Sequence, residues 1–147
     1  MRTVEPEALR TRTASMEEAI ASRTPPDVSF RLAGGPELRG QLIALAGDLE
    51  NSAGAPREIF LFPVAAFGFL LEAAAPLPRK PGGPPLPPPV PPPPLAVTLP
   101  ARTRVRLTAR LDLSPFVLPA AKELELRWQL LLWNEPRPGG ILRVTLP

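Results

Sequence analysis

The chain has 147 residues, of which 44% are apolar and 21% are charged, and its formal net charge is +3. This length predicts one domain, and the apolar fraction is sufficient for a hydrophobic core. Cysteine and histidine are both absent, which excludes disulfides, thiol nucleophiles, Ser-His-Asp catalysis and zinc sites built from these residues. We therefore expect a protein that is not an enzyme and has no metal site and no cofactor.

The composition is rich in Ala, Pro, Gly and Arg and poor in Lys and Asn. A GC-rich, bacterial genome explains this bias better than a polyanionic partner does, because a net charge of +3 is small. The longest apolar run, residues 59–71, is interrupted by Pro63 and is too short for a bilayer, which takes about 20 residues. The N-terminus has no apolar leader. We expect a cytoplasmic protein without a membrane span.

Residues 1–26 are predicted to form a polar N-terminal arm. Ser15 followed by Glu18 matches a capping box and predicts a short helix at 16–23. A helix of this length is marginal by itself. The arm is therefore expected either to be a mobile tail or to become ordered on a neighbouring subunit or partner.

Residues 27–147 are predicted to form one β-sandwich. Apolar and polar residues alternate with the period of a half-buried strand, most clearly in "RTRVRLTARLDL" and "KELELRWQLLLW". Turn signals separate the strands, and Gly68 is expected to mark a bulge or a close backbone approach. The spacing predicts an immunoglobulin-like or fibronectin-like sandwich of about 7–8 strands. The expected strands are 28–32, 38–49, 58–62, 64–73, 95–99, 102–113, 122–133 and 141–147.

A proline-rich segment, 76–94, divides these strands into two groups. Each group alone is too small for a stable two-sheet fold without a disulfide or metal. We therefore expect both groups to contribute to one sandwich, with the segment crossing between its sheets. Two alternatives stay open, a flexible linker and a polyproline ligand for another protein. Pro88 and Pro92 are the candidate contacts for a partner.

An arginine row on the predicted strand 102–113 is the main charged feature. Arg102, Arg104, Arg106 and Arg110 share the face opposite the apolar residues. The row is a candidate site for phosphate or an acidic partner. If this strand forms a hairpin with the next long strand, Glu123 and Glu125 instead neutralise the arginines. No aromatic residue is interleaved with the row, which argues against nucleic-acid binding.

The strand end "WQLLLW" indicates a covered surface, because Leu131 and Trp133 fall on the face that otherwise carries charges. The proline-rich segment, the arm or another subunit would cover it. The best carboxylate cluster, Asp48 and Glu50 beside Asn51, fits a polar strand end better than a catalytic pair or a calcium site.

These patterns predict a non-catalytic binding or structural protein. Its partner would be another protein or a second copy of the chain, and it would act as an accessory subunit of a larger bacterial or phage assembly. The alternative is a proteinaceous peptidase inhibitor that presents a proline-rigidified loop, either "SPFVLPAA" or the proline-rich segment. The candidate partner-binding residues are Leu131, Trp133, Arg102, Arg104, Arg106, Pro88 and Pro92.

Overall fold

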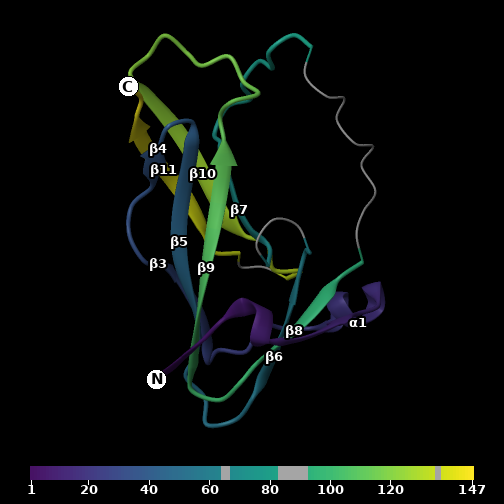
Figure 1. Ribbon diagram of the computed structural model, residues 1–147. Helices are drawn as coiled ribbons and strands as arrows, with labels where there is room; N and C mark the ends of the chain where they lie inside the picture. The colour runs from purple at the N-terminus through teal and green to yellow at the C-terminus, as the bar shows by residue number, and fades with distance from the viewer. Residues whose placement is uncertain (64–66, 83–92, 135–136) are drawn as a thin grey trace.

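The computed structural model describes residues 1–63, 67–82, 93–134 and 137–147, and this part of the chain is all-β, as predicted. Its strands form three sheets (Figure 1). The long sheet has the order β1–β9–β5–β3, and β4 also pairs with β5; the C-terminal sheet has the order β11–β10–β7, and the small sheet β2–β8–β6. The strands are β1 (Arg2–Val4), β2 (Arg10–Thr13), β3 (Val28–Leu32), β4 (Glu37–Arg39), β5 (Leu42–Asn51), β6 (Arg57–Leu61), β7 (Phe69–Ala73), β8 (Leu95–Leu99), β9 (Thr103–Asp112), β10 (Glu123–Leu130) and β11 (Gly139–Thr145).

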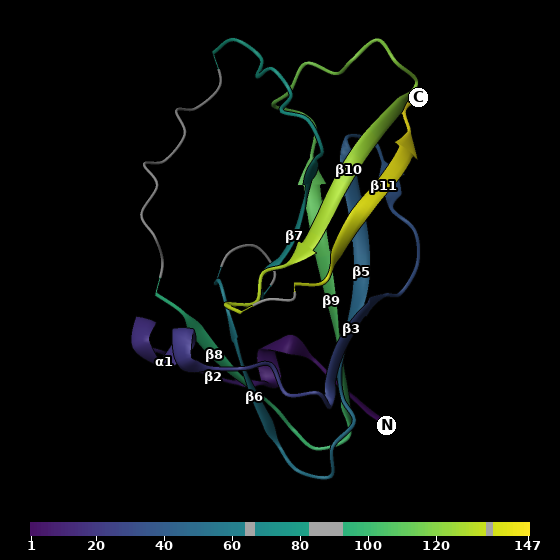
Figure 2. The same cartoon turned by 180° about the vertical axis from the view of Figure 1, so that it is seen from behind.

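The long and C-terminal sheets form two layers, and the small sheet lies at one end of them (Figures 1 and 2). One hydrophobic cluster joins the three sheets. Phe30 of β3 contacts the edge of the Phe69 ring of β7 at 5.0 Å between centroids and lies 5.9 Å from Trp128 of β10. These aromatic contacts join the long sheet to the C-terminal sheet.

All three sheets combine strands from both sides of the proline-rich segment. β5 pairs with β9, β7 with β10, and β6 with β8. The chain thus passes from the C-terminal sheet at β7 to the small sheet at β8. Pro94 continues the small sheet, since its carbonyl accepts a hydrogen bond from the Ala14 N–H. The predicted contacts Pro88 and Pro92 lie outside the described residues.

The described residues contain eleven strands, against about eight expected. The expected strand 38–49 is a hairpin, because Gly40 adopts a left-handed φ of 63° and turns β4 back onto β5. The other two additional strands, β1 and β2, come from the N-terminal residues.

Residues 1–26 are part of the sheets. β1 pairs in parallel with β9, a 3-10 helix η1 (Pro6–Ala8) follows, and β2 pairs with β8. The predicted helix is α1 (Met16–Ala21), and the Ser15 hydroxyl accepts from the Glu18 N–H as the capping motif predicts. β1 and β2 were not predicted, because their residues are mostly exposed and the strands are held by backbone pairing.

β9 shows the predicted alternation, with Val105, Leu107 and Ala109 buried. The expected hairpin with β10 is wrong. β9 pairs along its whole length with β5, whereas β10 pairs with β11 and β7. Alternation determines which face of a strand is buried but leaves its neighbours undetermined.

A sharp corner connects the long sheet to the small one. The antiparallel pairing of β5 with β9 resumes as β6 with β8, and residues 52–56 lie opposite 100–102 between the two ladders. Asn51, fully buried, lies at this corner. The segment that we expected to be a simple turn is thus the bend of a long two-stranded ribbon.

Candidate functional site

The outer face of the long sheet carries part of the predicted arginine row. Arg106 forms a two-fold hydrogen bond with Asp48, at 2.9 and 3.1 Å, and Arg104 Nε donates to Glu50 at 2.8 Å. Arg31 also reaches Glu50, at 3.4 Å. The arginines are therefore neutralised by the β5 carboxylates, and Glu123 and Glu125 lie on another sheet.

This pairing also accounts for the carboxylate cluster. Hydrogen bonds from Arg106, supported by the nearby charges of Arg104 and Arg31, lower the pKa of Asp48 below its ordinary value. A carboxylate held ionised in this way is poorly suited to exchange protons near neutral pH. The Asn51 side chain forms hydrogen bonds with the backbone at the corner. The cluster of Asp48, Glu50 and Asn51 therefore has a structural explanation. Among the described residues, no group of three or more acidic side chains has the geometry of a metal site.

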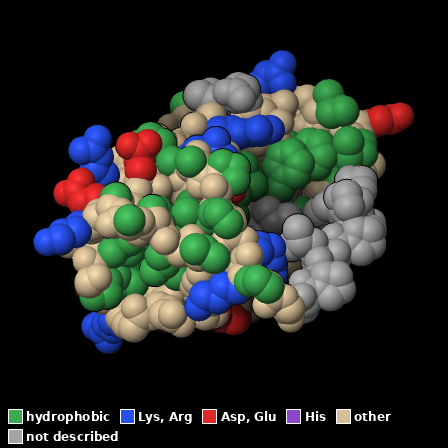
Figure 3. All heavy atoms as spheres, turned by 90° about the horizontal axis from the view of Figure 1, so that it is seen from above, with side chains coloured by type: hydrophobic (Ala, Val, Ile, Leu, Met, Phe, Trp, Pro, Cys, Tyr) green, Lys and Arg blue, Asp and Glu red, His purple; other side chains and the backbone are tan. Residues whose placement is uncertain are grey.

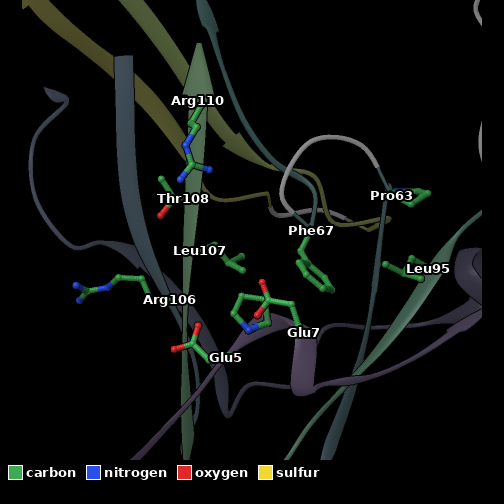
Figure 4. A pocket seen from close by; sticks show the side chains of 10 residues that line it. Glu5, Glu7, Pro63, Phe67, Leu95, Arg106, Leu107, Thr108 and Arg110 are labelled. Atoms are coloured by element: carbon green, nitrogen blue, oxygen red, sulfur yellow. The ribbon is translucent and has the colours of Figure 1, made fainter. Parts of the chain in front are cut away.

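Two other members of the row lie elsewhere. Arg102 is outside β9, in the corner turn, with a φ of 50°. Its carbonyl accepts from the Arg2 N–H at 3.1 Å. Arg110 lines a groove beside β9, on the side away from β5 (Figure 4). The row is consequently not a continuous basic surface.

Leu131 and Trp133 are both partly buried, and the chain itself covers Trp133. The indole stacks on Phe62 with 4.3 Å between ring centroids, and its N–H donates to the Leu61 carbonyl at 3.0 Å. Leu131 exchanges backbone hydrogen bonds with Phe62 and Gly68. The cover comes from the segment after β6, which was not among the three covers we considered. A role of either residue in partner binding stays a prediction.

A groove of about 560 Å³ lies beside β9 (Figure 4). Four segments that are distant in sequence line it: η1 and the residue before it, the connection between β6 and β7, the start of β8, and β9. Its lining residues are Glu5, Pro6, Glu7, Pro63, Phe67, Leu95, Arg106, Leu107, Thr108 and Arg110. Sequence reasoning missed this groove, because no single segment contains it.

The backbone of β9 is open toward this groove. Leu113 N–H donates to the Gln41 carbonyl on the β5 side, whereas the Arg102 carbonyl accepts from Arg2 on the β1 side. Backbone groups of successive strand residues point to alternate edges. The N–H and C=O groups of Thr108 and Arg110 therefore point to the β1 side. β1 pairs only with Thr103–Val105, so beyond that point no strand in the described part of the chain pairs with this edge of β9, whereas β5 pairs with the other edge throughout.

Neighbouring elements limit the open edge without closing it. After β1 ends, η1 still contacts β9, and β7 passes close to β9 but pairs with β10. Space for an added strand is thus confined to the stretch of β9 beside the groove, from Arg106 to Arg110.

Phe67 forms one wall of the groove in a strained conformation. Its φ is 51°, in the left-handed region that bulky residues rarely adopt. The next residue, Gly68, has a φ of 76° and lies so close to the Phe62 carbonyl that a Cβ there would be 3.1 Å from the oxygen. This confirms the close backbone approach expected at Gly68. Strain of about 1–3 kcal/mol at such a residue is common at functional sites.

Comparison of the chain with protein-family models, with curated proteins and with solved structures finds no match. Among the helices in the described residues, none is long and apolar enough to cross a membrane.

Proposed function

We propose that this protein is a non-catalytic binding protein that takes an extended segment of another protein onto the open edge of β9. The observation that carries the proposal is the pair of backbone positions, Thr108 and Arg110, whose hydrogen-bonding groups face a groove with no strand opposite them in the described residues. Peptides commonly bind by adding a strand to such an edge, where backbone hydrogen bonds provide affinity and side-chain pockets provide specificity. An accessory subunit of a larger assembly is the role that fits this binding mode.

The finer fold assignment supports the same proposal. We take the long and C-terminal sheets as the two layers of an immunoglobulin-like or fibronectin-like sandwich, with the small sheet as an extension at the corner. In this arrangement the groove lies where the two layers and the extension meet (Figures 1 and 4). The two layers and the small sheet would then together shape the site for the bound segment of the partner.

The test is capture of partners by the tagged full-length chain from its native lysate, with cross-links mapped by mass spectrometry. Thr108→Pro removes a backbone donor that faces the groove but leaves the β5 ladder intact, since proline is tolerated at strand edges. Ile141→Pro is the matched control. The Leu130 N–H donates to the Pro138 carbonyl, so by the same alternation Ile141 faces the outer edge of β11.

We expect Thr108→Pro to lower partner affinity about tenfold, through a lost hydrogen bond and the added ring. Ile141→Pro should retain the affinity, and thermal melts should show that both variants fold. A partner that binds both variants equally, or cross-links only outside the groove, would refute the proposal. Capture that disappears in both variants would also count against it.

A second function, inhibition of a peptidase, is supported by the loop 114–121. Val117 and Leu118 are 47% and 37% exposed. The loop is held to a neighbouring segment, because Val117 N–H donates to the Pro78 carbonyl at 2.7 Å and Lys80 N–H to the Pro115 carbonyl at 2.8 Å. Figure 3, a view onto this end of the molecule, shows hydrophobic side chains gathered there. An anchored loop with exposed apolar side chains suits insertion into an enzyme cleft.

Residual activity of a panel of peptidases, titrated with the protein, tests the second function. Inhibition that is lost in Val117→Asp and retained in Thr108→Pro would assign it to the loop. Inhibition that Val117→Asp leaves unchanged would exclude the loop as the inhibitory element. The other candidate inhibitory loop, the proline-rich segment, lies largely outside the described residues.

A further inference from the structure

We infer that the segment bound beside β9 carries an apolar residue between a basic residue at one end and an acidic residue at the other. This inference rests on the proposed function and specifies the chemistry of its ligand. It comes from the lining of the groove, which carries charges of opposite sign at its two ends and apolar side chains between them (Figure 4).

The end of the groove near η1 is acidic. Glu5 and Glu7 line it, and both are exposed. Neither carboxylate forms an ion pair with any described residue, whereas most other acidic side chains of the protein, including Asp48, Glu50 and Glu58, do. A cation of the ligand placed here would meet two carboxylates that the described chain leaves available.

The opposite end of the groove is basic. Arg110 is exposed and lines the groove above Thr108 (Figure 4). Its guanidinium forms no ion pair within the described residues, in contrast to Arg104 and Arg106 on the same strand. Arg106 also lines the groove, but its guanidinium is held by Asp48. Arg110 is therefore the arginine of β9 that is available to a ligand carboxylate.

The middle of the groove is apolar. Leu107 forms its floor, and Phe67, Leu95 and Pro63 surround it (Figure 4). Leu107 is buried, so a ligand side chain would contact the surface above it and the Phe67 ring. The left-handed conformation of Phe67 places the ring here.

The length of the open edge sets the spacing of these three features. Arg106 to Arg110 spans four residue steps, or roughly 13 Å at about 3.3 Å per residue. An added strand of about five residues fits this length, and its successive side chains point to opposite faces. Leu107 lies on the opposite face of β9 from Arg106 and Arg110, so the apolar residue of the ligand faces away from its two charged residues. The matching pattern is a basic residue, an apolar residue next to it, and an acidic residue three positions further. The pattern can run in either chain direction, because both directions give ladders with β9.

Four labelled peptides with the cores KITTE, QITTE, KITTQ and QITTQ test this pattern against the full-length protein. Fluorescence anisotropy at about 20 mM salt measures affinity, since low salt preserves exposed charge interactions. We expect KITTE to bind about two- to five-fold more tightly than either peptide with a single charge, the range found for exposed ion pairs. Amide exchange should slow at Thr108 and stay unchanged at Ile141 on the control edge.

Protein variants assign each peptide charge to its partner by double-mutant cycles. Arg110→Gln should abolish the advantage of KITTE over KITTQ while keeping its advantage over QITTE. The double variant Glu5→Gln, Glu7→Gln should do the reverse. Arg143→Gln on β11 is the matched control, because it removes an equally exposed arginine outside the groove, and it should change neither difference.

The outcomes separate the inference from the proposed function. If all four peptides bind equally and still slow amide exchange at Thr108, the groove binds strands and the charge pattern is refuted. Charge dependence that persists in Arg110→Gln and in the Glu5, Glu7 double variant would also refute it. A concentration of about 1 mM detects any binding free energy stronger than about −4 kcal/mol. If no peptide binds at that concentration, both the inference and strand addition at this edge are refuted.

Discussion

Asn51 holds the corner that joins the long and small sheets, and its replacement by alanine gives the most informative test of the fold. The side chain is fully buried. Its amide nitrogen lies 3.1 Å from the carbonyls of Ala55, Leu99 and Pro100, and its oxygen accepts from the Ala53 N–H at 3.0 Å. One side chain thus links both strands of the bent ribbon.

The expected loss of stability follows from the groups left without partners. The Pro100 carbonyl keeps the Thr103 hydroxyl at 2.7 Å, and the Ala55 carbonyl is only partly buried. The Ala53 N–H is buried and loses its acceptor. The Leu99 carbonyl faces β6, where Leu99 pairs with Arg57, so it loses only one of its hydrogen bonds. An unsatisfied buried group costs about 1–3 kcal/mol and an ordinary hydrogen bond contributes about 1 kcal/mol. We therefore expect Asn51→Ala to lower the free energy of unfolding by about 3 kcal/mol.

Urea unfolding at neutral pH, followed by tryptophan fluorescence, measures this loss. With a slope of about 2 kcal/mol/M, the midpoint should fall by about 1.5 M. A loss below about 1 kcal/mol would refute the reasoning, because it would mean that the corner satisfies these groups without Asn51.

Asn51→Asp separates the hydrogen bonds from the shape of the side chain. The variant keeps the acceptor for Ala53 but faces the three carbonyls with a carboxyl group. Burial and these carbonyls should raise the pKa of that carboxyl above its ordinary value. A raised pKa gives stability that is present below the ordinary value of about 4 and lost as pH rises through the folded value. The variant should therefore become less stable relative to the native chain as pH rises, whereas the deficit of Asn51→Ala should stay flat.

Three further predictions concern the pairing on the long sheet and the cover over β10. The lowered pKa of Asp48 means that its pairing with Arg106 stabilises the fold above about pH 4, and that this stabilisation is lost as pH falls through the lowered value. Asp48→Asn should therefore reduce the acid-induced fall in melting temperature by a few degrees. An unchanged fall would contradict this. Gly68→Ala should cost about 2 kcal/mol in urea unfolding, because the residue has a left-handed φ and no room for a Cβ, and a neutral effect would argue against the strain. Trp133→Phe should cost about 1 kcal/mol, since it loses the hydrogen bond to the Leu61 carbonyl but keeps the ring stack; a loss above about 3 kcal/mol would show that the ring stack is lost as well.

The sequence was informative wherever a local rule determines the structure. Alternation identified the buried face of β9, Ser15 identified the start of α1, and Gly68 identified a close approach. Each of these features depends on a few neighbouring residues and on the geometry of one element.

The sequence was uninformative where distant segments meet. The arginines of β9 have the same alternation whether Glu123 of β10 or Asp48 of β5 lies beside them, and only the pairing of β5 with β9 decides. Phe62 stacks on Trp133 although the two residues are 71 positions apart in the sequence. β1 lacks an apolar pattern, because backbone hydrogen bonds hold it at the edge of the long sheet.

The open edges of this fold differ in how they are protected, and this difference favours β9 as the binding edge. Natural sheets guard free edges with exposed charges or cover them with other segments. Arg31 and Arg143 project from the edge strands β3 and β11 with side chains 71% and 69% exposed. The edge of β6 is covered, since Trp133 N–H donates to the Phe60 carbonyl. The β9 edge instead lies within a groove that has an apolar floor. An edge that only needed protection from aggregation would not require a strained phenylalanine beside it, whereas an edge that receives a segment needs a wall to contact its side chains.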